Sequence, residues 1–242
     1  MKFGHYSDDE MPVQHNPGYA VNSYGYRCPE WRPMPDGAKN VIVLGCSHTF
    51  GEGLDEGEVW VYRVAAKTDP KRLRWWNLGQ PGASGDKIVR ILYATEKVFF
   101  PKIIIICWPL RSRRERLLNF NKKQLPQINL TGGDTLLKYE NNETDQQNFL
   151  KNVFFAEKFA EKQGAKIFHC FAQDIYEVNS TYVFADTSLQ QCWPEWDSHH
   201  LPNAKREHIT TPSLAKDGVH YGVEHHTVFA EKFYNKFKSK LR

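Results

Sequence analysis

The segment VIVLGCSHTFGEG, Val41–Gly53, constrains the fold of this chain more than any other part of it. Four consecutive apolar residues run directly into Gly45, Cys46 and Ser47, and a glycine-spaced loop follows. Such an apolar run is typical of a strand buried on both faces of a parallel sheet. Ligands of open α/β folds bind beyond the carboxyl ends of these strands. The segment therefore predicts a parallel sheet that presents one serine hydroxyl at its ligand-binding edge.

Strand-like and helix-like patterns alternate from residue 41 onward, which is the signature of a parallel sheet covered by helices. The predicted strands are Val41–Cys46, Arg74–Leu78, Lys102–Trp108 and Lys166–Phe171. The 242 residues suffice for one α/β domain with a sizeable core. We expect a three-layer α/β/α domain over residues 41–242, with a parallel sheet of about five strands.

Helices are predicted where apolar residues recur at three-and-four spacing. One has the face Ile88, Ile91, Leu92, Thr95 and Val98, with Ser84 or Asp86 as its N-cap. Another has the face Leu150, Val153, Phe154 and Phe159 and ends at Gly164. The last lies near Val223–Lys240 and buries Phe229, Phe233 and Phe237, with His225 and His226 expected on its surface.

Three other segments lack helical periodicity. Residues 1–40 are rich in Pro, Gly, Tyr and Asn, and we expect an irregular N-terminal arm with short strands, around Tyr19–Arg27. The connections 109–145 and 172–216 are long for a compact domain. Loops of that length are usually functional or mobile, so we expect these two to cover the binding cleft.

Composition excludes several classes of protein. With 40% hydrophobic and 25% charged residues, the chain is globular rather than disordered. A net charge of +4 is too small to indicate a nucleic-acid-binding protein without a clustered basic face. One basic cluster, Arg111–Arg116, is interpreted as a solvated helix start or, alternatively, as a contact for substrate or a polyanion. The aromatic content of 14% suits loops packed over a sheet, or a carbohydrate-facing cleft.

The cysteines and the N-terminus predict a cytoplasmic protein. The five cysteines show no CxxC pair and no metal spacing, so we expect buried, reduced thiols. No apolar signal segment or membrane-spanning run is visible, which predicts no membrane partner. A group formed by Asp197, His199, His200 and His208 matches no common zinc pattern and is expected to be a solvated loop. We therefore predict no metal and no cofactor.

Ser47, Asp217 and His220 could act together as a catalytic triad. A serine hydroxyl becomes a useful nucleophile when a base takes its proton and a third group orients that base. Asp217 and His220 are three residues apart, which lets the carboxylate reach Nδ1 while Nε2 points toward Ser47. The segment lacks the second glycine of a GxSxG elbow, which disfavours the common α/β-hydrolase fold. Cys46 is expected to be buried rather than nucleophilic.

These residues resemble the SGNH (GDSL) hydrolase family. Its first block, Gly-Asp-Ser-x-Thr-x-Gly, is similar to Gly45–Gly51 here. Its second block resembles Asn77–Ser84, which would place Gly82, or alternatively Gly79, beside the Ser47 N–H in the oxyanion hole. Its fifth block, Asp-x-x-His, resembles Asp217–His220. The resemblance implies a flavodoxin-like sheet and a serine esterase with Ser47 as nucleophile, His220 as base and Asp217 as orienting carboxylate.

Two departures from the family pattern matter. Cys46 replaces the first-block aspartate. The third block should supply an asparagine oxyanion donor after the Lys102–Trp108 strand, but Cys107–Glu115 contains none. This segment resembles a Trp-x-x-x-x-Arg-x-Glu variant of some bacterial and phage relatives, which suggests such an origin. Losing one oxyanion donor costs about 2.7–4 kcal/mol in the barrier, unless Arg111 or another donor replaces it.

Further residues are assigned as possible contacts. His48, Trp108 and Arg111 are possible substrate-binding residues, with surface packing as the alternative for His48. The stretch Asn22–Arg27 resembles an N-S-x-G-x-R hairpin of some relatives and is expected to be a tight turn pinned by Gly25 and Arg27.

The resemblance implies an esterase or deacetylase that removes a small acyl group from a glycan or another small ester. An O-acetyltransferase that uses the same serine is one alternative. A catalytically weak glycan-binding or accessory protein is another, motivated by the missing asparagine. The oligomeric state is left open.

Overall fold

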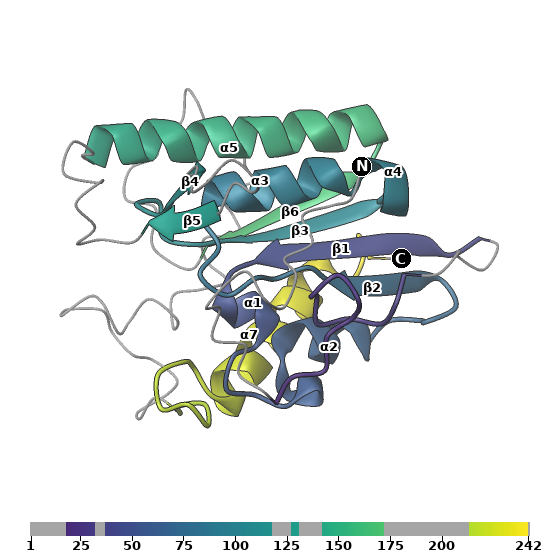
Figure 1. Ribbon diagram of the computed structural model, residues 1–242. Helices are drawn as coiled ribbons and strands as arrows, with labels where there is room; N and C mark the ends of the chain where they lie inside the picture. The colour runs from purple at the N-terminus through teal and green to yellow at the C-terminus, as the bar shows by residue number, and fades with distance from the viewer. Residues whose placement is uncertain (1–17, 32–36, 118–126, 131–141, 172–212, 242) are drawn as a thin grey trace.

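The computed structural model describes residues 18–31, 37–117, 127–130, 142–171 and 213–241 (Figure 1). The strands are β1 Lys39–Gly45, β2 Leu73–Asn77, β3 Ile103–Trp108, β4 Arg114–Leu117, β5 Gln127–Leu130 and β6 Lys166–Phe171. The helices are α1 Ser47–Phe50, α2 Trp60–Ala65, α3 Gly85–Ala94, α4 Glu96–Phe99, α5 Asn142–Gln163 and α7 Val223–Phe237, with a short 3₁₀ helix, η1, at Glu56–Glu58.

The main sheet is parallel and has the order β2-β1-β3-β6, with β1 in the interior (Figure 1). This is the flavodoxin-like arrangement, in which the chain crosses over after the second strand. All four predicted strands are present, with ends shifted by at most two residues. The described residues supply four strands to this sheet, so the fifth strand that we expected is not among them.

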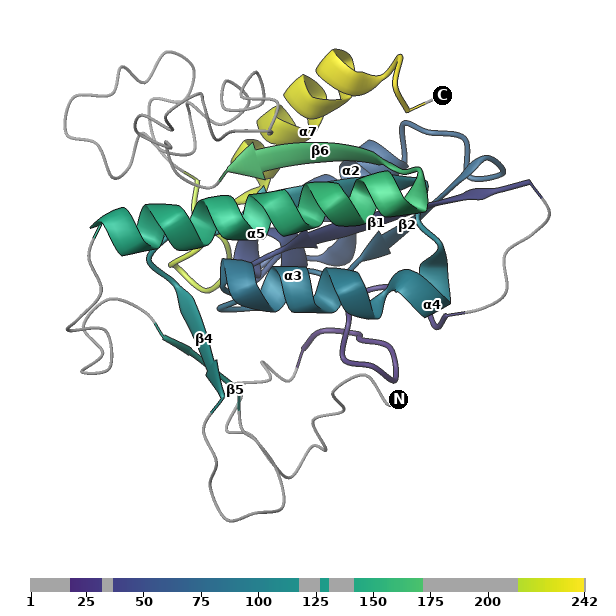
Figure 2. The ribbon, with the colours of Figure 1, turned by 90° about the horizontal axis from the view of Figure 1, so that it is seen from above.

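Helices cover both faces of the sheet. In Figure 1, α3 and α5 lie above it, whereas α2 and α7 lie below it. Figure 2 shows α3 and α5 running side by side along the strands. Because both faces are covered, β3 is buried along its whole length, with every residue of Ile103–Trp108 at most 3% exposed. The predicted three-layer α/β/α architecture is confirmed.

The predicted helices are found, although Thr95 and Val98 lie beyond the end of α3 and some buried positions differ from expectation. Ser84, not Asp86, caps α3, because its Oγ accepts a hydrogen bond from the Lys87 N–H at 3.2 Å. Gly164 ends α5 with a left-handed φ of +59°. Phe154 was wrongly assigned to the buried face of α5, since its side chain is 39% exposed. In its place, Ala156 and Ala160 complete the buried stripe.

The N-terminal segment and the basic cluster also differ from expectation. Residues 18–31 form turns, and no strand is assigned around Tyr19–Arg27. The arm's boundary at residue 40 stays a prediction. Arg111–Arg116 does not begin a helix, because Arg114–Leu117 is β4, which pairs with β5 in an antiparallel hairpin.

Parts of the sequence analysis lie outside the described residues. Most of the 172–216 connection falls there, as do Asp197, His199, His200 and His208. Among the described helices, none combines the length and hydropathy needed to cross a membrane. Within the same ranges, no group of three or more His, Cys, Asp or Glu side chains could hold a metal ion.

Packing beneath the sheet generates the first prediction. Phe233 of α7 is fully buried against Trp60, Phe229 and Phe237. We expect Phe233→Ala to lower the free energy of unfolding by about 3–5 kcal/mol, because the cavity removes contacts on several sides. Phe155→Ala is the matched control, because that ring is 42% exposed, and its effect should stay within about 0.5 kcal/mol. Urea unfolding measures both, and equal losses would contradict this packing.

Candidate active site

Ser47 lies at the carboxyl edge of the sheet, where β1 turns into α1. The turn is tight, because a methyl group at Gly45 would lie 2.1 Å from Thr49 Oγ1. The Cys46 carbonyl accepts hydrogen bonds from the N–H groups of Thr49 and Phe50. Ser47 is the first residue of α1, where an N–H group has no acceptor within the helix, and it is 5% exposed. Cys46 is a buried free thiol, as predicted.

Asp217 and His220 form a pair on the loop that precedes α7. Asp217 Oδ2 lies 2.6 Å from His220 Nδ1, and Oδ1 accepts hydrogen bonds from the N–H groups of Val219 and His220 at 2.9 and 3.0 Å. Burial raises the pKa of Asp217, but these hydrogen bonds and the imidazole outweigh it, and the net pKa is lowered. One ionised carboxylate thus fixes both the backbone turn and the imidazole ring.

A close backbone contact joins this loop to the segment after Ser47. The Lys216 N–H donates to the Gly53 carbonyl at 3.0 Å. A methyl group at Gly53 would lie 2.5 Å from Ala215 Cβ and 2.9 Å from Asp217 Cγ. The φ of Gly53 is +76°, in the left-handed region that favours glycine. The contact brings together two segments that are more than 160 residues apart in the chain.

Arg27 holds the same segment from the other side. Its buried guanidinium donates to the carbonyls of Gly51 at 2.6 Å and Leu54 at 2.7 Å. The Asn22 side chain accepts hydrogen bonds from two backbone N–H groups of its own turn, and Gly25 has a φ of +77°. The expected tight turn pinned by Gly25 and Arg27 is therefore present, and Arg27 acts on the site by positioning residues 51–54.

Glu52 is a site residue that the sequence analysis missed. Its Oε2 lies 3.2 Å from His220 Nε2, and both side chains are about one-fifth exposed. Within the described part of the chain, no hydrogen bond joins Ser47 Oγ to His220. Burial raises the pKa of Glu52, and the Asp217 charge raises it further, against the opposing effects of His220 and Arg113. The structure therefore brings Asp217 and His220 together but leaves Nε2 facing Glu52.

The neighbouring histidines pack against the loop before α7 that carries Asp217 and His220, which we call the triad loop. The His48 ring stacks on Tyr221 at 5.2 Å and meets the edge of His220 at 5.4 Å. Burial, aided by nearby positive groups, lowers the pKa of His48, so it is neutral at pH 7. His225 and His226 are 4% and 1% exposed, so their expected place on the helix surface is wrong.

These two histidines anchor the start of α7. His226 Nδ1 accepts a hydrogen bond from the Trp60 N–H at 3.1 Å, which ties α7 to α2. Burial lowers the pKa of His226 to about 3, and a neutral ring can serve as this acceptor. The His225 ring stacks on Tyr221 at 4.7 Å.

The two candidate oxyanion glycines have different environments. The Gly79 N–H already donates to Asn77 Oδ1 at 3.0 Å, and a methyl group there would lie 2.5 Å from the Phe50 nitrogen. Gly79 is therefore a close-packing position against α1. Gly82 has a φ of +67° and open space around an added methyl group. No hydrogen bond within the described ranges uses its N–H, so Gly82 stays the predicted donor.

The residues after β3 are mostly fixed by structural contacts. Trp108 is fully buried and donates to His169 Nδ1 at 2.9 Å, so it is a core residue, and we no longer assign it to substrate binding. Arg111 is half-buried, and its carbonyl accepts a hydrogen bond from Arg114. Its possible contact with substrate stays a prediction.

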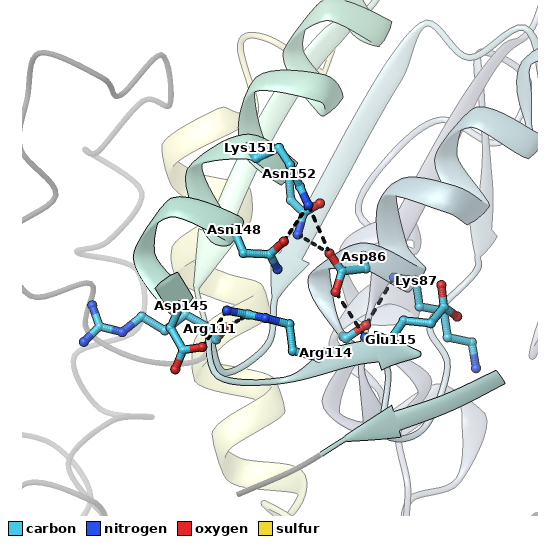
Figure 3. Close-up of polar contacts among 10 residues, drawn as sticks. Asp86, Lys87, Arg111, Arg114, Glu115, Asp145, Asn148, Lys151 and Asn152 are labelled. Carbon is cyan, nitrogen blue, oxygen red and sulfur yellow. Dashed lines mark hydrogen bonds and ion pairs between the residues drawn. The ribbon is translucent and has the colours of Figure 1, made fainter. Parts of the chain in front are cut away.

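A polar network holds this loop against α3 and α5 (Figure 3). Buried Arg114 pairs with Asp145 at 2.6 Å. Asp86, at the start of α3, accepts hydrogen bonds from the Glu115 N–H and from the side chain of Asn152. Glu115 pairs through both oxygens with Arg90. The loop 109–113, which leads from β3 to β4, is thus anchored at its far end.

Several solved structures align with most of this chain. A putative acylhydrolase from Bacteroides fragilis aligns with a TM-score of 0.50 and 11% identity, over 88% of this chain and 93% of that one. A carbohydrate acetylesterase family member from Sinorhizobium meliloti aligns with a TM-score of 0.49 and 11% identity, over 84% and 99%. A G-D-S-L family lipolytic protein from Veillonella parvula aligns with a TM-score of 0.45 and 15% identity, over 83% and 99%.

At sequence identities this low, the alignments show similarity of fold and nothing about function. No family model matches the sequence, and neither does any curated protein. The three-layer fold that the resemblance to SGNH hydrolases implies is confirmed, whereas membership of that family stays a prediction. The bacterial or phage subtype and the roles of individual residues stay predictions.

The contact at Gly53 generates the second prediction. We expect Gly53→Ala to lower the free energy of unfolding by about 1–3 kcal/mol, because the added methyl group overlaps the triad loop and the left-handed φ is strained. Gly57→Ala is the control, because an added methyl group there meets nothing within 4 Å. Thermal unfolding of both variants checks this. Equal stability of Gly53→Ala and the wild type would contradict the close contact.

Proposed function

We propose that this protein is a serine-dependent ester hydrolase that removes a small acyl group from a glycan or another small ester. The observation that carries the proposal is the Asp217–His220 pair, with 2.6 Å between Oδ2 and Nδ1, on a loop that contacts the segment after Ser47. An imidazole oriented by a carboxylate is the group that makes a serine hydroxyl nucleophilic.

The proposed reaction has two halves. Ser47 Oγ forms a bond to the acyl carbon while His220 Nε2 takes the hydroxyl proton, and the carbonyl electron pair moves to oxygen. The N–H groups of Ser47 and Gly82 stabilise that oxyanion. When it collapses, the bond to the alcohol oxygen breaks and His220 returns the proton to the leaving alkoxide. Water then attacks the acyl-enzyme by the same steps and releases the acid.

Asp217 keeps its charge during this cycle. Because the pKa of Asp217 is lowered from its ordinary value, its carboxylate is ionised at neutral pH. The carboxylate then orients Nδ1 and stabilises the imidazolium that forms. Glu52 must leave Nε2 before Ser47 can use the base. The contact between Glu52 and His220 also supports the second candidate function, a catalytically weak binding protein.

Covalent labelling of Ser47 tests the proposal. We expect a neutral fluorophosphonate to label the wild type at Ser47, because the reagent needs an activated serine. Ser47→Ala should take no label, whereas Ser23→Ala, at an exposed serine of the N-terminal turn, should label normally. Mass spectrometry of the peptides identifies the modified residue. An unlabelled wild type would favour the binding protein, and label on another residue would remove the nucleophile assignment.

Hydrolysis and acyl transfer are separated by product analysis. With an acetylated sugar as substrate and a second sugar as acceptor, we assign the acyl group to water. Acetylated acceptor forming faster than free acetate would make the protein an O-acetyltransferase that uses the same serine.

Glu52 gives a separate prediction. We expect Glu52→Ala to label up to about tenfold faster than the wild type, because a competing hydrogen bond of roughly 1.5 kcal/mol to Nε2 is removed. Glu52→Gln is the matched control, since its amide still occupies Nε2, and a smaller change is expected. The second-order labelling rate measures both. Slower labelling of Glu52→Ala would show that Glu52 assists the base.

A further inference from the structure

Two nitrogens of the Arg113 guanidinium are buried and have no hydrogen-bond partner among the residues that the structure describes. Its Nε and Nη1 atoms are both excluded from solvent and neither meets an acceptor. Within the described part of the chain, the side chain makes no hydrogen bond and no ion pair. The backbone of Arg113 is nevertheless well held, because its N–H donates to the Leu110 carbonyl at 3.1 Å.

Such a group needs an explanation. A desolvated donor with no acceptor is unfavourable, and a charged donor more so than a neutral one. Native proteins leave few buried polar groups unsatisfied, and those that persist often serve a ligand or a reaction. An anionic oxygen that arrives with substrate would satisfy one of these two donors with a charge-assisted hydrogen bond.

Neighbouring arginines show that this state is specific to Arg113. Arg114 is buried too, but its guanidinium pairs with Asp145 at 2.6 Å and donates to the Arg111 carbonyl at 2.8 Å (Figure 3). Arg90 forms two hydrogen bonds with Glu115. The two adjacent arginines therefore differ in their contacts. Arg114 holds the loop through its ion pair, whereas Arg113 keeps donors that could bind a ligand oxygen.

The position of Arg113 relates it to the candidate active site. It follows β3, and the carboxyl end of β3 lies at the same edge of the sheet as Ser47, because Gly45 pairs with Cys107. Arg113 is also close enough to lower the pKa values of His48 and Glu52. His48 follows Ser47 directly, and Glu52 meets His220 Nε2.

We propose that Arg113 is the side-chain oxyanion donor of the site, in place of the asparagine that the segment after β3 lacks. The inference rests on the proposed function. When Ser47 Oγ bonds to the acyl carbon, the electron pair of the carbonyl moves to its oxygen and His220 takes the serine proton. Arg113 keeps its own protons and donates hydrogen bonds to that O⁻, beside the N–H groups of Ser47 and Gly82. A charged donor aimed at developing negative charge stabilises the transition state more than the ground state.

The substitution Arg113→Gln tests this role. Removing one oxyanion donor costs about 10²–10³-fold in rate. We expect that loss in the fluorophosphonate labelling rate at Ser47, since the phosphoryl oxygen takes the place of the oxyanion. The same loss is expected in kcat for a neutral acetate ester, with KM changed less than about twofold, because the contact is absent from the ground state. Arg113→Lys keeps the positive charge with a different geometry, so its labelling rate and kcat should lie between those of the wild type and Arg113→Gln.

Two controls separate this role from a structural one. Arg72→Gln removes an exposed arginine that precedes β2, at the opposite edge of the sheet, and should leave both rates unchanged. Arg114→Gln should lower Tm, because it removes the buried ion pair with Asp145. Arg113→Gln should not lower Tm, because it removes donors that have no partner.

The outcomes are distinct. Labelling of Arg113→Gln at the wild-type rate would overturn the inference while leaving Ser47 as the nucleophile. A loss confined to KM for esters that carry a carboxylate would also overturn it and would assign Arg113 to a substrate anion. If the wild type takes no label at Ser47, the proposed function fails, and this inference fails with it.

Discussion

The candidate site depends on a close backbone approach between Gly53 and the loop before α7. Ser47 and His220 lie 173 residues apart, and the parallel sheet alone places only Ser47. The Lys216–Gly53 hydrogen bond and the absence of a side chain at Gly53 let the triad loop lie against the segment that follows α1. Arg27 holds that segment from behind through buried hydrogen bonds to the carbonyls of Gly51 and Leu54.

Burial shifts the pKa values of several titratable side chains around this contact toward the uncharged form. His48 and His226 are buried with lowered pKa values, whereas the pKa of Glu52 is raised. Asp217 is the exception, because three hydrogen bonds to its carboxylate outweigh burial. Two carboxylates, those of Asp217 and Glu52, thus lie on either side of the His220 ring, and the positive charge of Arg113 lies close enough to lower the pKa values of Glu52 and His48.

The sequence predicted the features that have a local signature. Apolar runs located all four strands of the sheet within two residues, and the Asp-x-x-His spacing located a carboxylate and an imidazole that do pair. Predictions from the sequence failed where tertiary contacts determine which way a side chain faces. Phe154 fits the helical period but faces outward, and Trp108 ends a strand in the core rather than in a cleft. No sequence pattern indicated Glu52, and the basic cluster Arg111–Arg116 did not single out Arg113, because the surroundings of both side chains are set by contacts in space.

The arrangement of the site is tested most directly by a crystal structure of the protein labelled with a neutral phosphonate. The account predicts phosphorus bonded to Ser47 Oγ, the phosphoryl oxygen within hydrogen-bond distance of the Gly82 N–H and the Arg113 guanidinium, and His220 Nε2 released from Glu52. An adduct whose phosphoryl oxygen meets neither Gly82 nor Arg113, or one attached to a residue other than Ser47, would contradict it.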